Sequence, residues 1–341
     1  MLDHTAPQSS PTSNASQQGF IEDVLPTLLA WRRENIASAL VTVVGVDGSS
    51  PRPVGSQMAV SIDGRYVGQI SSGCAELAIV EEAISCLKNG KNRVIRYGKG
   101  SPYLDIVLPC GSGIDIFFDS QIPTTTIANL TTSLEARQPA TLEFDLKQLS
   151  CQTSDSVGGG PDQDHRALAN MTWSEGDTVY KRYAPQIRLL TMGRGHIVGA
   201  MAQLGQYLGY ETHVFAPDIE ILNDTAKAGA KTTKHLTTPS EKLTELEDLS
   251  DPWTAAVLMF HDHEWEPALL KKLLATECFF IGAIGSKRTH AQRLEALEDM
   301  GCTPQHLSRI KGPVGLDIGA KNPLEIALSI SAEILQNIRQ N

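Results

Sequence analysis

The sequence predicts an α/β protein in which a mixed α+β domain is followed by a domain built on a parallel sheet. The first observation is the length of 341 residues, which is enough for about two domains that each bury a core. The second is that short β-branched runs and turn signals dominate the first half of the chain. The third is that apolar strands alternate with helical patterns in the second half, the order that produces a parallel sheet covered by helices.

The composition excludes several classes of protein. Hydrophobic residues make up 41% and charged residues 20% of the chain, which is typical of a folded globular protein. Its 29 Lys and Arg against 39 Asp and Glu give a net charge of −10, which argues against nucleic-acid binding. There is no apolar run of about 18 residues that would span a membrane, and the polar start lacks the features of a secretory signal. We therefore expect a cytoplasmic protein whose 6 cysteines are reduced.

Changes in composition along the chain predict four segments. Residues 1–19 are rich in Ser, Thr, Gln and Pro and are expected to form a disordered tail. Residues 20–149 form the N-terminal domain and residues 186–341 the C-terminal domain. Residues 150–185 are predicted to be a linker or surface loop, because the run Gly158-Gly159-Gly160-Pro161 lies in polar surroundings there.

In the N-terminal domain, strands and two helices follow from local patterns. Helical spacing of apolar residues predicts helices over 21–31 and 77–87, the second ended by Gly90. Asp63-Gly64 between two apolar runs predicts a hairpin. The strands expected in this domain are 39–46, 57–62, 65–70, 93–97, 103–108 and 113–118.

The C-terminal domain carries stronger signals. Its expected strands are 187–192, 212–216, 255–260 and 278–281. The final helix has a complete start signal, since Asn322 can cap it, Pro323 suits its first position and Glu325 completes a capping box. A parallel sheet with intervening helices is therefore expected for this domain.

A glycine motif makes this C-terminal domain Rossmann-like. Gly193 and Gly195 stand between a predicted strand and a helix, where glycines bring backbone N–H groups close to a phosphate. Asp218, after the next strand, could reach a ribose. His196 follows the glycines and faces the same crevice or packs at the helix start. The other interpretation is a Rossmann-like domain that binds no nucleotide.

Two cysteines stand in settings that favour chemistry. Cys74 follows Ser71-Ser72-Gly73 at a helix start, where the helix dipole favours a thiolate that acts as a nucleophile or a soft metal ligand. The alternative is a small buried residue. Cys110 lies in a turn between Pro109 and Gly111. The remaining cysteines are expected to be structural or incidental: Cys86, Cys151, Cys278 and Cys302.

Three further segments carry polar groups that suit ligands. His261 and His263 follow a buried strand and could hold a metal, or they belong to an ordinary polar loop. The segment Gly285-Ser286-Lys287-Arg288 could cradle an anion, or it is a turn with solvated cations. The same choice applies to Ser50 and Arg52, where Arg52 between two prolines could hold a phosphate or a carboxylate.

Taken in their order along the chain, these motifs resemble the XdhC/CoxI family from about Phe20 to Arg339. The segments that carry the resemblance are Gly48-Ser49-Ser50-Pro51-Arg52-Pro53, Ser71-Ser72-Gly73-Cys74-Ala75-Glu76, Leu108-Pro109-Cys110-Gly111, Gly193-Arg194-Gly195-His196, His261-Asp262-His263, Ile281-Gly282-Ala283-Ile284-Gly285-Ser286-Lys287-Arg288 and Gly312-Pro313-Val314-Gly315-Leu316-Asp317-Ile318-Gly319-Ala320.

The resemblance implies a maturation chaperone rather than a turnover enzyme. Such a factor binds the molybdenum cofactor, a molybdopterin in its mononucleotide or dinucleotide form, and carries it without using it. It assists sulfuration and inserts the cofactor into an apo molybdenum hydroxylase of the xanthine dehydrogenase or aldehyde oxidase type. A cysteine desulfurase and a second copy of the chain are further implied partners.

The resemblance also implies which residues bind the cofactor. Cys74 is the first candidate, also as a molybdenum ligand, and Cys110 is the second. The other implied cofactor-binding residues are Ser50, Arg52, Gly193, Gly195, His196, Gly285, Ser286, Lys287 and Arg288.

Two rival functions follow from the residues themselves. The first is an NAD(P)-dependent oxidoreductase that uses the Rossmann-like domain, with His261 or His263 as acid or base. Arg194, between the glycines, affects this hypothesis in either direction, because its cationic side chain could block NAD or bind a phosphate. The second is a metal-binding scaffold through the two histidines. The chain has neither a Gly-x-Ser-x-Gly motif nor a Walker loop, and no iron–sulfur spacing of cysteines.

Overall fold

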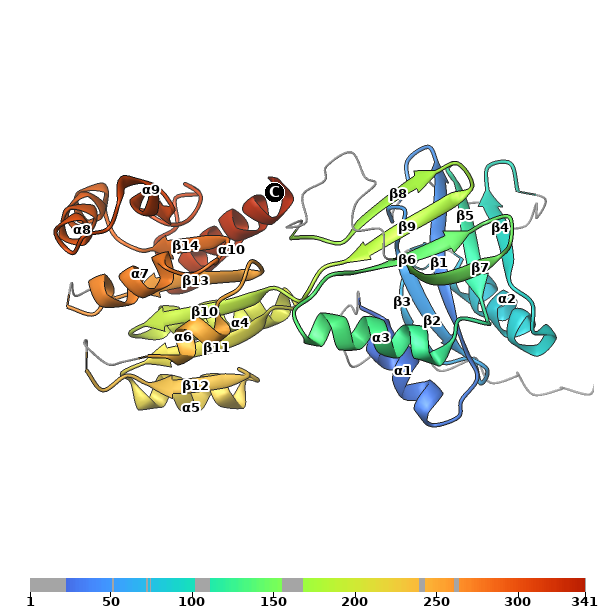
Figure 1. Ribbon diagram of the computed structural model, residues 1–341, viewed down its shortest axis with the longest axis horizontal. Helices are drawn as coiled ribbons and strands as arrows, with labels where there is room; N and C mark the ends of the chain where they lie inside the picture. Colours follow the sequence, from blue (N-terminus) through green and yellow to red (C-terminus); the bar gives the residue numbers. More distant parts are fainter. Residues whose placement is uncertain are drawn as a thin grey trace, which may run out of the picture. The chain divides into compact units, whose positions relative to one another are not determined.

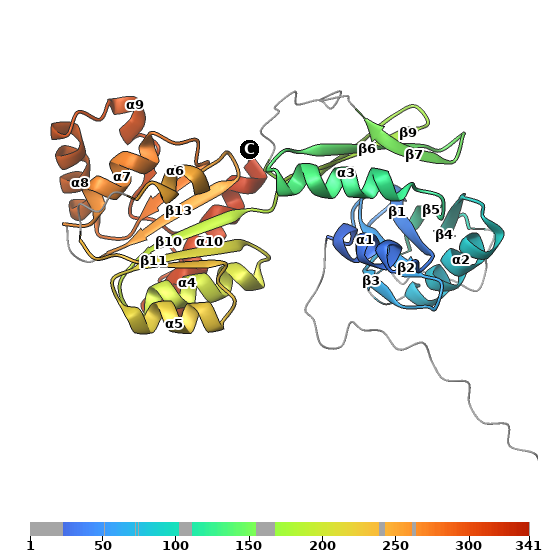
Figure 2. The same cartoon turned by 60° about the horizontal axis from the view of Figure 1, so that its bottom comes forward.

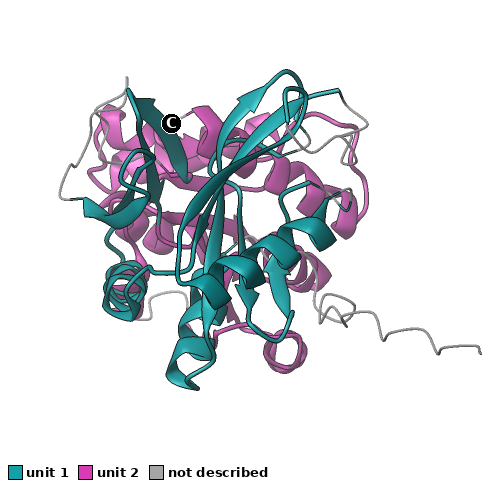
Figure 3. Cartoon of the chain, turned by 90° about the vertical axis from the view of Figure 1, so that its right-hand side faces the viewer, with its two compact units in different colours: residues 1–165, 170–184 teal, residues 166–169, 185–341 magenta. Residues whose placement is uncertain are grey.

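A computed structural model of the chain describes residues 23–50, 52–71, 73, 75–101, 111–154, 168–238, 243–260 and 264–340. The chain divides into two compact units (Figure 3). Unit 1 comprises residues 1–165 and 170–184, and unit 2 comprises residues 166–169 and 185–341. Among the described residues, no helix has both the length and the apolar character needed to cross a membrane.

Unit 1 contains a five-stranded antiparallel sheet with the order β3-β2-β1-β5-β4 in its described residues (Figure 1). Its strands are β1 (Ser38–Asp47), β2 (Gln57–Ser61), β3 (Tyr66–Gly68), β4 (Arg93–Gly98) and β5 (Gly113–Asp119). They match five of the six predicted strands, and the predicted strand 103–108 lies outside the described residues.

Both faces of the central strand β1 are buried along most of its length, which explains why most of its residues are apolar. Val41 and Val43 pack in a cluster with helix α2 (Glu76–Asn89). Leu40 and Val44, on the other face, pack in a cluster with helix α1 (Leu25–Arg33). Helix α2 ends as predicted, because Gly90 adopts a left-handed conformation with φ 59°.

A second antiparallel sheet of unit 1 has the order β7-β6-β9-β8 in the described residues. Its strands are β6 (Ala140–Asp145), β7 (Ser150–Ser154), β8 (Met171–Glu175) and β9 (Thr178–Tyr183). Helix α3 (Thr124–Glu135) runs along it (Figure 2). Phe144 of β6 meets Phe117 of β5 edge to face, with 5.9 Å between ring centroids, so the two sheets share one core.

The prediction of a linker over residues 150–185 is wrong where β7, β8 and β9 form. The glycine-rich run at 158–161 lies outside the described residues. Strands β7 and β8 are short, and most of their residues are polar and partly exposed, so they carry little hydrophobic pattern. They form because β6 and β9 offer edges for pairing, which local sequence does not reveal.

Unit 2 contains a six-stranded parallel sheet with the order β12-β11-β10-β13-β14-β15 in its described residues. The strands are β10 (Arg188–Gly193), β11 (Glu211–Ala216), β12 (Thr232–His235), β13 (Thr254–Met259), β14 (Phe280–Ala283) and β15 (Ile310–Lys311). Numbered along the chain, this is the order 3-2-1-4-5-6 of dinucleotide-binding folds. The predicted Rossmann-like domain is confirmed.

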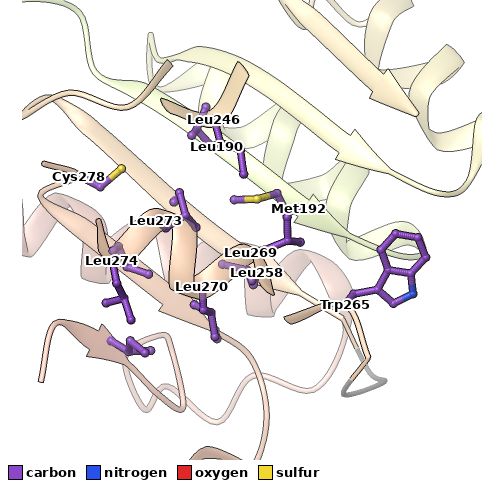
Figure 4. Packing of buried hydrophobic residues seen from close by; sticks show 14 of the residues in the cluster. Leu190, Met192, Leu246, Leu258, Trp265, Leu269, Leu270, Leu273, Leu274 and Cys278 are labelled. Carbon is purple, nitrogen blue, oxygen red and sulfur yellow. The ribbon is translucent and has the colours of Figure 1, made fainter. Parts of the chain in front are cut away.

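Helices cover both faces of the parallel sheet (Figure 1). They are α4 (His196–Tyr207), α5 (Ile219–Lys227), α6 (Glu245–Leu249), α7 (Glu266–Leu274), α8 (Lys287–Asp299), α9 (Pro304–Leu307) and α10 (Pro323–Gln340). On one face, Leu269 and Leu270 of α7 pack near Leu258 of β13 (Figure 4). Helices α4, α5 and α10 pack together, with α4 against β10 and β11.

The predicted capping box at the start of α10 is confirmed. The backbone N–H of Glu325 donates to Asn322 Oδ1 at 3.0 Å. In return, the backbone N–H of Asn322 donates to Glu325 Oε2 at 3.3 Å. Both contacts satisfy N–H groups that would otherwise lack partners at a helix start.

Candidate functional site

Three connections of unit 1 leave its five-stranded sheet toward the same end. They comprise residues 48–56, 69–75 and 99–112. Asp47, at the end of β1, lies opposite Gly113 at the start of β5. Gly68, at the end of β3, lies opposite Met58 near the start of β2. Because neighbouring strands run in opposite directions, the ends of β1, β3 and β4 point the same way as the starts of β2 and β5.

These connections carry every candidate residue that the sequence singled out in the N-terminal half. Ser50 and Arg52 lie in the first connection, and both are half-buried. Cys74 belongs to the second and Cys110 to the third, and both cysteines lie outside the described residues. The fold thus directs the chain on either side of each candidate toward one end of one sheet.

The first connection contacts the third through two small residues. Gly48 has a φ of 86°, a conformation that favours glycine. A Cβ atom at Gly48 would lie 3.6 Å from the Cα atom of Ser112, so the two backbones run close together. Within the first connection, the backbone N–H of Arg52 donates to Ser50 Oγ at 3.4 Å. The hydroxyl of Ser50 therefore shapes the turn that presents Arg52.

A buried cation from the second sheet supports the far end of the first connection. The ammonium group of Lys181, on β9, donates to the carbonyl of Gly55 and lies 5.0 Å from the ring centroid of Tyr183. The backbone N–H of Gly55 donates to the carbonyl of Val43 at 2.8 Å. Sequence reasoning missed Lys181, and the available signal was its place between Val179 and Tyr183 in an alternating strand.

The second connection is organised around the buried carboxylate of Glu76, the first residue of α2. Glu76 Oε1 accepts the backbone N–H of Ser71 at 2.8 Å, and Oε2 accepts that of Gly73 at 2.7 Å. The N–H of Ala75 lies 3.3 Å from Oε2. Burial disfavours the charged form, but the hydrogen bonds from Ser71 and the loop amides outweigh it and lower the pKa of Glu76. The amides at this helix start, expected to favour a thiolate at Cys74, therefore already serve a carboxylate.

The four cysteines inside the described residues are free thiols. Cys86 and Cys278 are buried in hydrophobic clusters. Burial, with Glu82 nearby, raises the pKa of Cys86 to about 11, and burial also raises the pKa of Cys278. Thiols that stay protonated in this way are poor nucleophiles and poor metal ligands.

In unit 2 the predicted glycine loop joins β10 to α4. Gly193 ends β10, and a Cβ atom there would lie 2.5 Å from the carbonyl oxygen of Met259, so glycine is what lets β10 approach β13. Gly195 precedes α4 with a φ of 75°. His196 is the exposed first residue of that helix. Strands β10 and β13 are neighbours where the strand order reverses, which is where open α/β sheets bind ligands.

Two charged side chains lie at this glycine loop: Asp218 follows the neighbouring strand β11, and Arg194 belongs to the loop itself. Asp218, just after β11, accepts the backbone N–H of Gly195 through Oδ2 at 3.1 Å. The guanidinium of Arg194 lies 5.6 Å from the ring centroid of Trp265, a cation–π distance. Trp265 in turn stacks on Phe260, with 5.7 Å between centroids and 3° between planes. A carboxylate at the loop amide suits a sugar hydroxyl, and the cation beside it suits a phosphate.

The segment Gly285–Arg288 forms the start of α8. Ser286 caps the helix, because its Oγ accepts the backbone N–H of Thr289 at 3.1 Å. Lys287 and Arg288 are exposed in the first turn. The hydroxyl expected to bind an anion is therefore used as a helix cap, while the two cations remain accessible to solvent.

A buried ion pair lies behind this segment. Arg293 of α8 bonds Glu266 of α7 through two contacts, Nε to Oε2 at 3.0 Å and Nη2 to Oε1 at 3.2 Å. Its Nη2 also donates to the carbonyl of Ile284 at 2.6 Å. The side chains of Arg293 and Glu266 are 1% and 2% exposed. The pair therefore joins the helices that follow β13 and β14 at the carboxyl edge of the sheet.

The predicted metal site cannot be built from the residues that the structure describes. His261 and His263 lie outside them. Within the described ranges, no group of three or more His, Cys, Asp or Glu side chains could hold a metal ion.

Comparison with known proteins agrees with this two-unit arrangement. Residues 31–98 match the XdhC and CoxI family, and residues 189–334 match the XdhC Rossmann domain. A crystal structure described as a xanthine dehydrogenase from Bacillus halodurans shares the fold, with a TM-score of 0.73 and 23% identity. The similarity covers 93% of this chain and 96% of that one.

Two curated relatives are similar along nearly their whole length. The molybdenum cofactor insertion chaperone PaoD of Escherichia coli is 32% identical over 325 residues, which cover 93% of this chain and 90% of PaoD. A probable xanthine dehydrogenase subunit of Bacillus subtilis is 26% identical over 336 residues, which cover 93% of this chain and 97% of that protein. From the motifs, the fold and these similarities, we conclude that the chain belongs to the XdhC and CoxI family.

Proposed function

We propose that this protein binds the molybdenum cofactor, carries it without turnover, and inserts it into an apo molybdenum hydroxylase of the xanthine dehydrogenase or aldehyde oxidase type. The observation that carries the proposal is the similarity to a relative named as a molybdenum cofactor insertion chaperone. A hydroxylase as partner agrees with the second relative, which is named as part of a probable xanthine dehydrogenase. The proposal includes a homodimer in the cytoplasm.

The residues of unit 1 fit the chemical groups of this cofactor. Molybdenum and its sulfur ligands are soft, and a reduced thiol such as Cys74 or Cys110 is a suitable neighbour for them. The phosphate of the pterin side chain needs cationic donors, and Arg52 in the adjacent connection supplies a planar set of N–H groups. The three connections start and finish at the same end of the sheet, which supports a single site.

The cofactor-binding role is tested by the pterin content of the purified protein. Wild type, Cys74→Ala and Cys151→Ala are purified without oxygen from a host that makes molybdopterin. Molybdenum and the fluorescent oxidation product of the pterin are then measured per chain. Cys151 is a matched control, because it is a thiol of the same unit in none of the three connections.

We expect near-stoichiometric pterin in wild type and Cys151→Ala, and at least a several-fold loss in Cys74→Ala. Equal content in all three would keep the carrier function but remove Cys74 from the site. A wild type that takes up no pterin, even from an excess of free cofactor, would contradict the proposed function.

Help with sulfuration is a finer part of the same proposal. A carrier that holds the cofactor beside a thiol can present the cofactor to a cysteine desulfurase, which is the sulfur donor. The test compares cyanide-labile sulfur in a client hydroxylase that matures with and without this protein. A client that gains cofactor but no labile sulfur would limit the role to carriage and insertion.

The contact between Asp218 and Gly195 favours one second candidate, an NAD(P)-dependent oxidoreductase. An acidic residue at this position of a Rossmann-like sheet suits the hydroxyl groups of a ribose. Titration with NADH, followed by its fluorescence, tests this candidate against Asp218→Asn. Saturable binding that the substitution weakens would favour it, and the absence of binding would leave cofactor carriage alone.

A further inference from the structure

Glu76 has an unusual number of donors from a single short segment. Its Oε1 lies 2.8 Å from the backbone nitrogen of Ser71 and 3.3 Å from that of Ile70. Its Oε2 lies 2.7 Å from the backbone nitrogen of Gly73 and 3.3 Å from that of Ala75. The residue itself is 5% exposed. All these donors lie between the end of β3 and the start of α2, so the N–H groups of four residues converge on one carboxylate.

The hydroxyl of Ser71 closes this network. It donates to Glu76 Oε2 at 2.5 Å and accepts the backbone N–H of Ala75 at 2.7 Å. A buried carboxylate is stable only when such donors compensate for the lost hydration, and charge-assisted hydrogen bonds are the strong ones. Removing the carboxylate would leave several N–H groups without their acceptor, and three of these donors belong to the buried residues Ile70, Ser71 and Ala75. The backbone at Ser71, Gly73 and Ala75 is therefore held by this one side chain.

The donors of Gly73 and Ala75 have a particular significance, because these residues flank Cys74 in sequence. Backbone N–H groups of a loop that enters a helix are the usual cradle for a phosphate. Here Glu76 fills the cradle with a carboxylate that belongs to the chain. An incoming phosphate would have to displace a negative charge held by several hydrogen bonds.

We propose that Glu76 is a positioning residue of the second connection: its carboxylate fixes the backbone at Ser71, Gly73 and Ala75 and excludes phosphate from this helix start. The inference rests on the proposed function and places the anionic end of the cofactor away from this helix start. The anionic end is held by other donors, for which the connection of Arg52 is the candidate in unit 1.

The test compares Glu76→Gln with Glu81→Gln. Both substitutions remove one negative charge from α2, but Glu81 is exposed and Glu76 is buried. Glutamine keeps the size of the side chain. Its N–H₂ group can only donate, so it cannot replace Oε2 as the acceptor for the backbone N–H of Gly73. Ser71→Ala is the milder companion, since it removes only the hydroxyl that bridges Ala75 and Glu76.

Two readouts are measured on each variant: amide hydrogen exchange of the segment 70–76, and pterin content after anaerobic purification. In Glu76→Gln we expect exchange at Ser71, Gly73 and Ala75 to accelerate at least ~10-fold, a factor that corresponds to about 1.4 kcal/mol of lost protection. Pterin content should fall several-fold. Ser71→Ala should change both readouts less and in the same direction, and Glu81→Gln should match the wild type.

The outcomes separate this inference from the proposed function. Unchanged exchange in Glu76→Gln would overturn the positioning role, and so would faster exchange with wild-type pterin content. Slower exchange of the wild-type segment on adding inorganic phosphate would overturn the exclusion of phosphate. A wild type without pterin would refute the proposed function instead, and the exchange rates alone would then decide whether Glu76 fixes the segment.

Discussion

Replacing Glu266 with glutamine should destabilise unit 2 strongly, because it leaves a buried guanidinium without its carboxylate. Arg293 is 1% exposed and makes two contacts with Glu266 and one with the carbonyl of Ile284. Breaking a buried ion pair from one side costs about 3–5 kcal/mol. With a urea m-value of about 2 kcal/mol/M, the midpoint of unit 2 should fall by roughly 1.5–2.5 M.

The assay must report on unit 2 alone, since the chain has two units and a single unfolding curve would mix them. Hydrogen exchange of peptides from α7 and α8, measured across a urea series, meets this need. Asp224→Asn is the control, because it breaks an exposed ion pair with Lys227 in α5 and should leave the midpoint unchanged.

A double substitution tests the reasoning itself. Arg293→Met alone should also destabilise unit 2, since it leaves Glu266 buried without its guanidinium. The two substitutions together should cost about 2 kcal/mol less than the sum of the single effects, because neither charge is then stranded. Additivity within about 0.5 kcal/mol, or a midpoint shift below about 0.5 M for Glu266→Gln, would refute the assignment of a coupled buried pair.

Three further substitutions test other parts of the molecule. Gly193→Ala should cost about 1–3 kcal/mol in urea unfolding of unit 2, because its Cβ would lie 2.5 Å from the carbonyl oxygen of Met259. Asn322→Ala should lower stability by about 1 kcal/mol in the same assay, and Asn322→Asp, which keeps the cap, should not. Hydrogen bonds, first of all from His213, hold the pKa of Glu211 far below its ordinary value of about 4.3. A carboxyl group whose pKa is lower in the folded than in the unfolded protein stabilises the fold at pH values above the unfolded pKa. This contribution is lost as the pH falls toward the folded pKa. Glu211→Gln should therefore lower the free energy of unfolding at pH 7. The difference in this free energy between the variant and the wild type should become smaller below about pH 4.3.

The parts of the fold that sequence predicts well are those in which local and tertiary preferences agree. Strand β1 is mostly apolar because both of its faces are buried along most of its length, and α10 starts at a complete capping box. Strands β12 and β15 were missed for the opposite reason. Among the residues that the structure describes, Thr232–His235 has no buried residue and pairs with β11 alone, and Ile310–Lys311 spans two residues. Their strand conformation comes from the edge they join rather than from their own sequence.

The candidate site divides in a similar way. The glycine loop after β10 was predictable, because a close backbone approach admits only glycine at Gly193. Ser286, expected at an anion site, also caps α8, because its hydroxyl lies three residues before Thr289 and accepts that N–H. Glu76 was not recognised, because an acidic residue in a first helical turn is common and its burial becomes visible only in three dimensions.

The alternation of an antiparallel sheet explains why motifs far apart in sequence gather at one end. Ser38 pairs with Ser61 and Arg93 with Phe118, which places the hairpin at Asp63 and the start of β4 at the opposite end. The chain therefore returns to the motif-bearing end at every second connection, and the intervening connections serve as turns. Asp63→Asn changes one of those turns, where Ser61 and Arg65 contact the carboxylate. We expect it to leave pterin content at the wild-type level, and a loss comparable to that of Cys74→Ala would mean that the two ends of the sheet do not act separately.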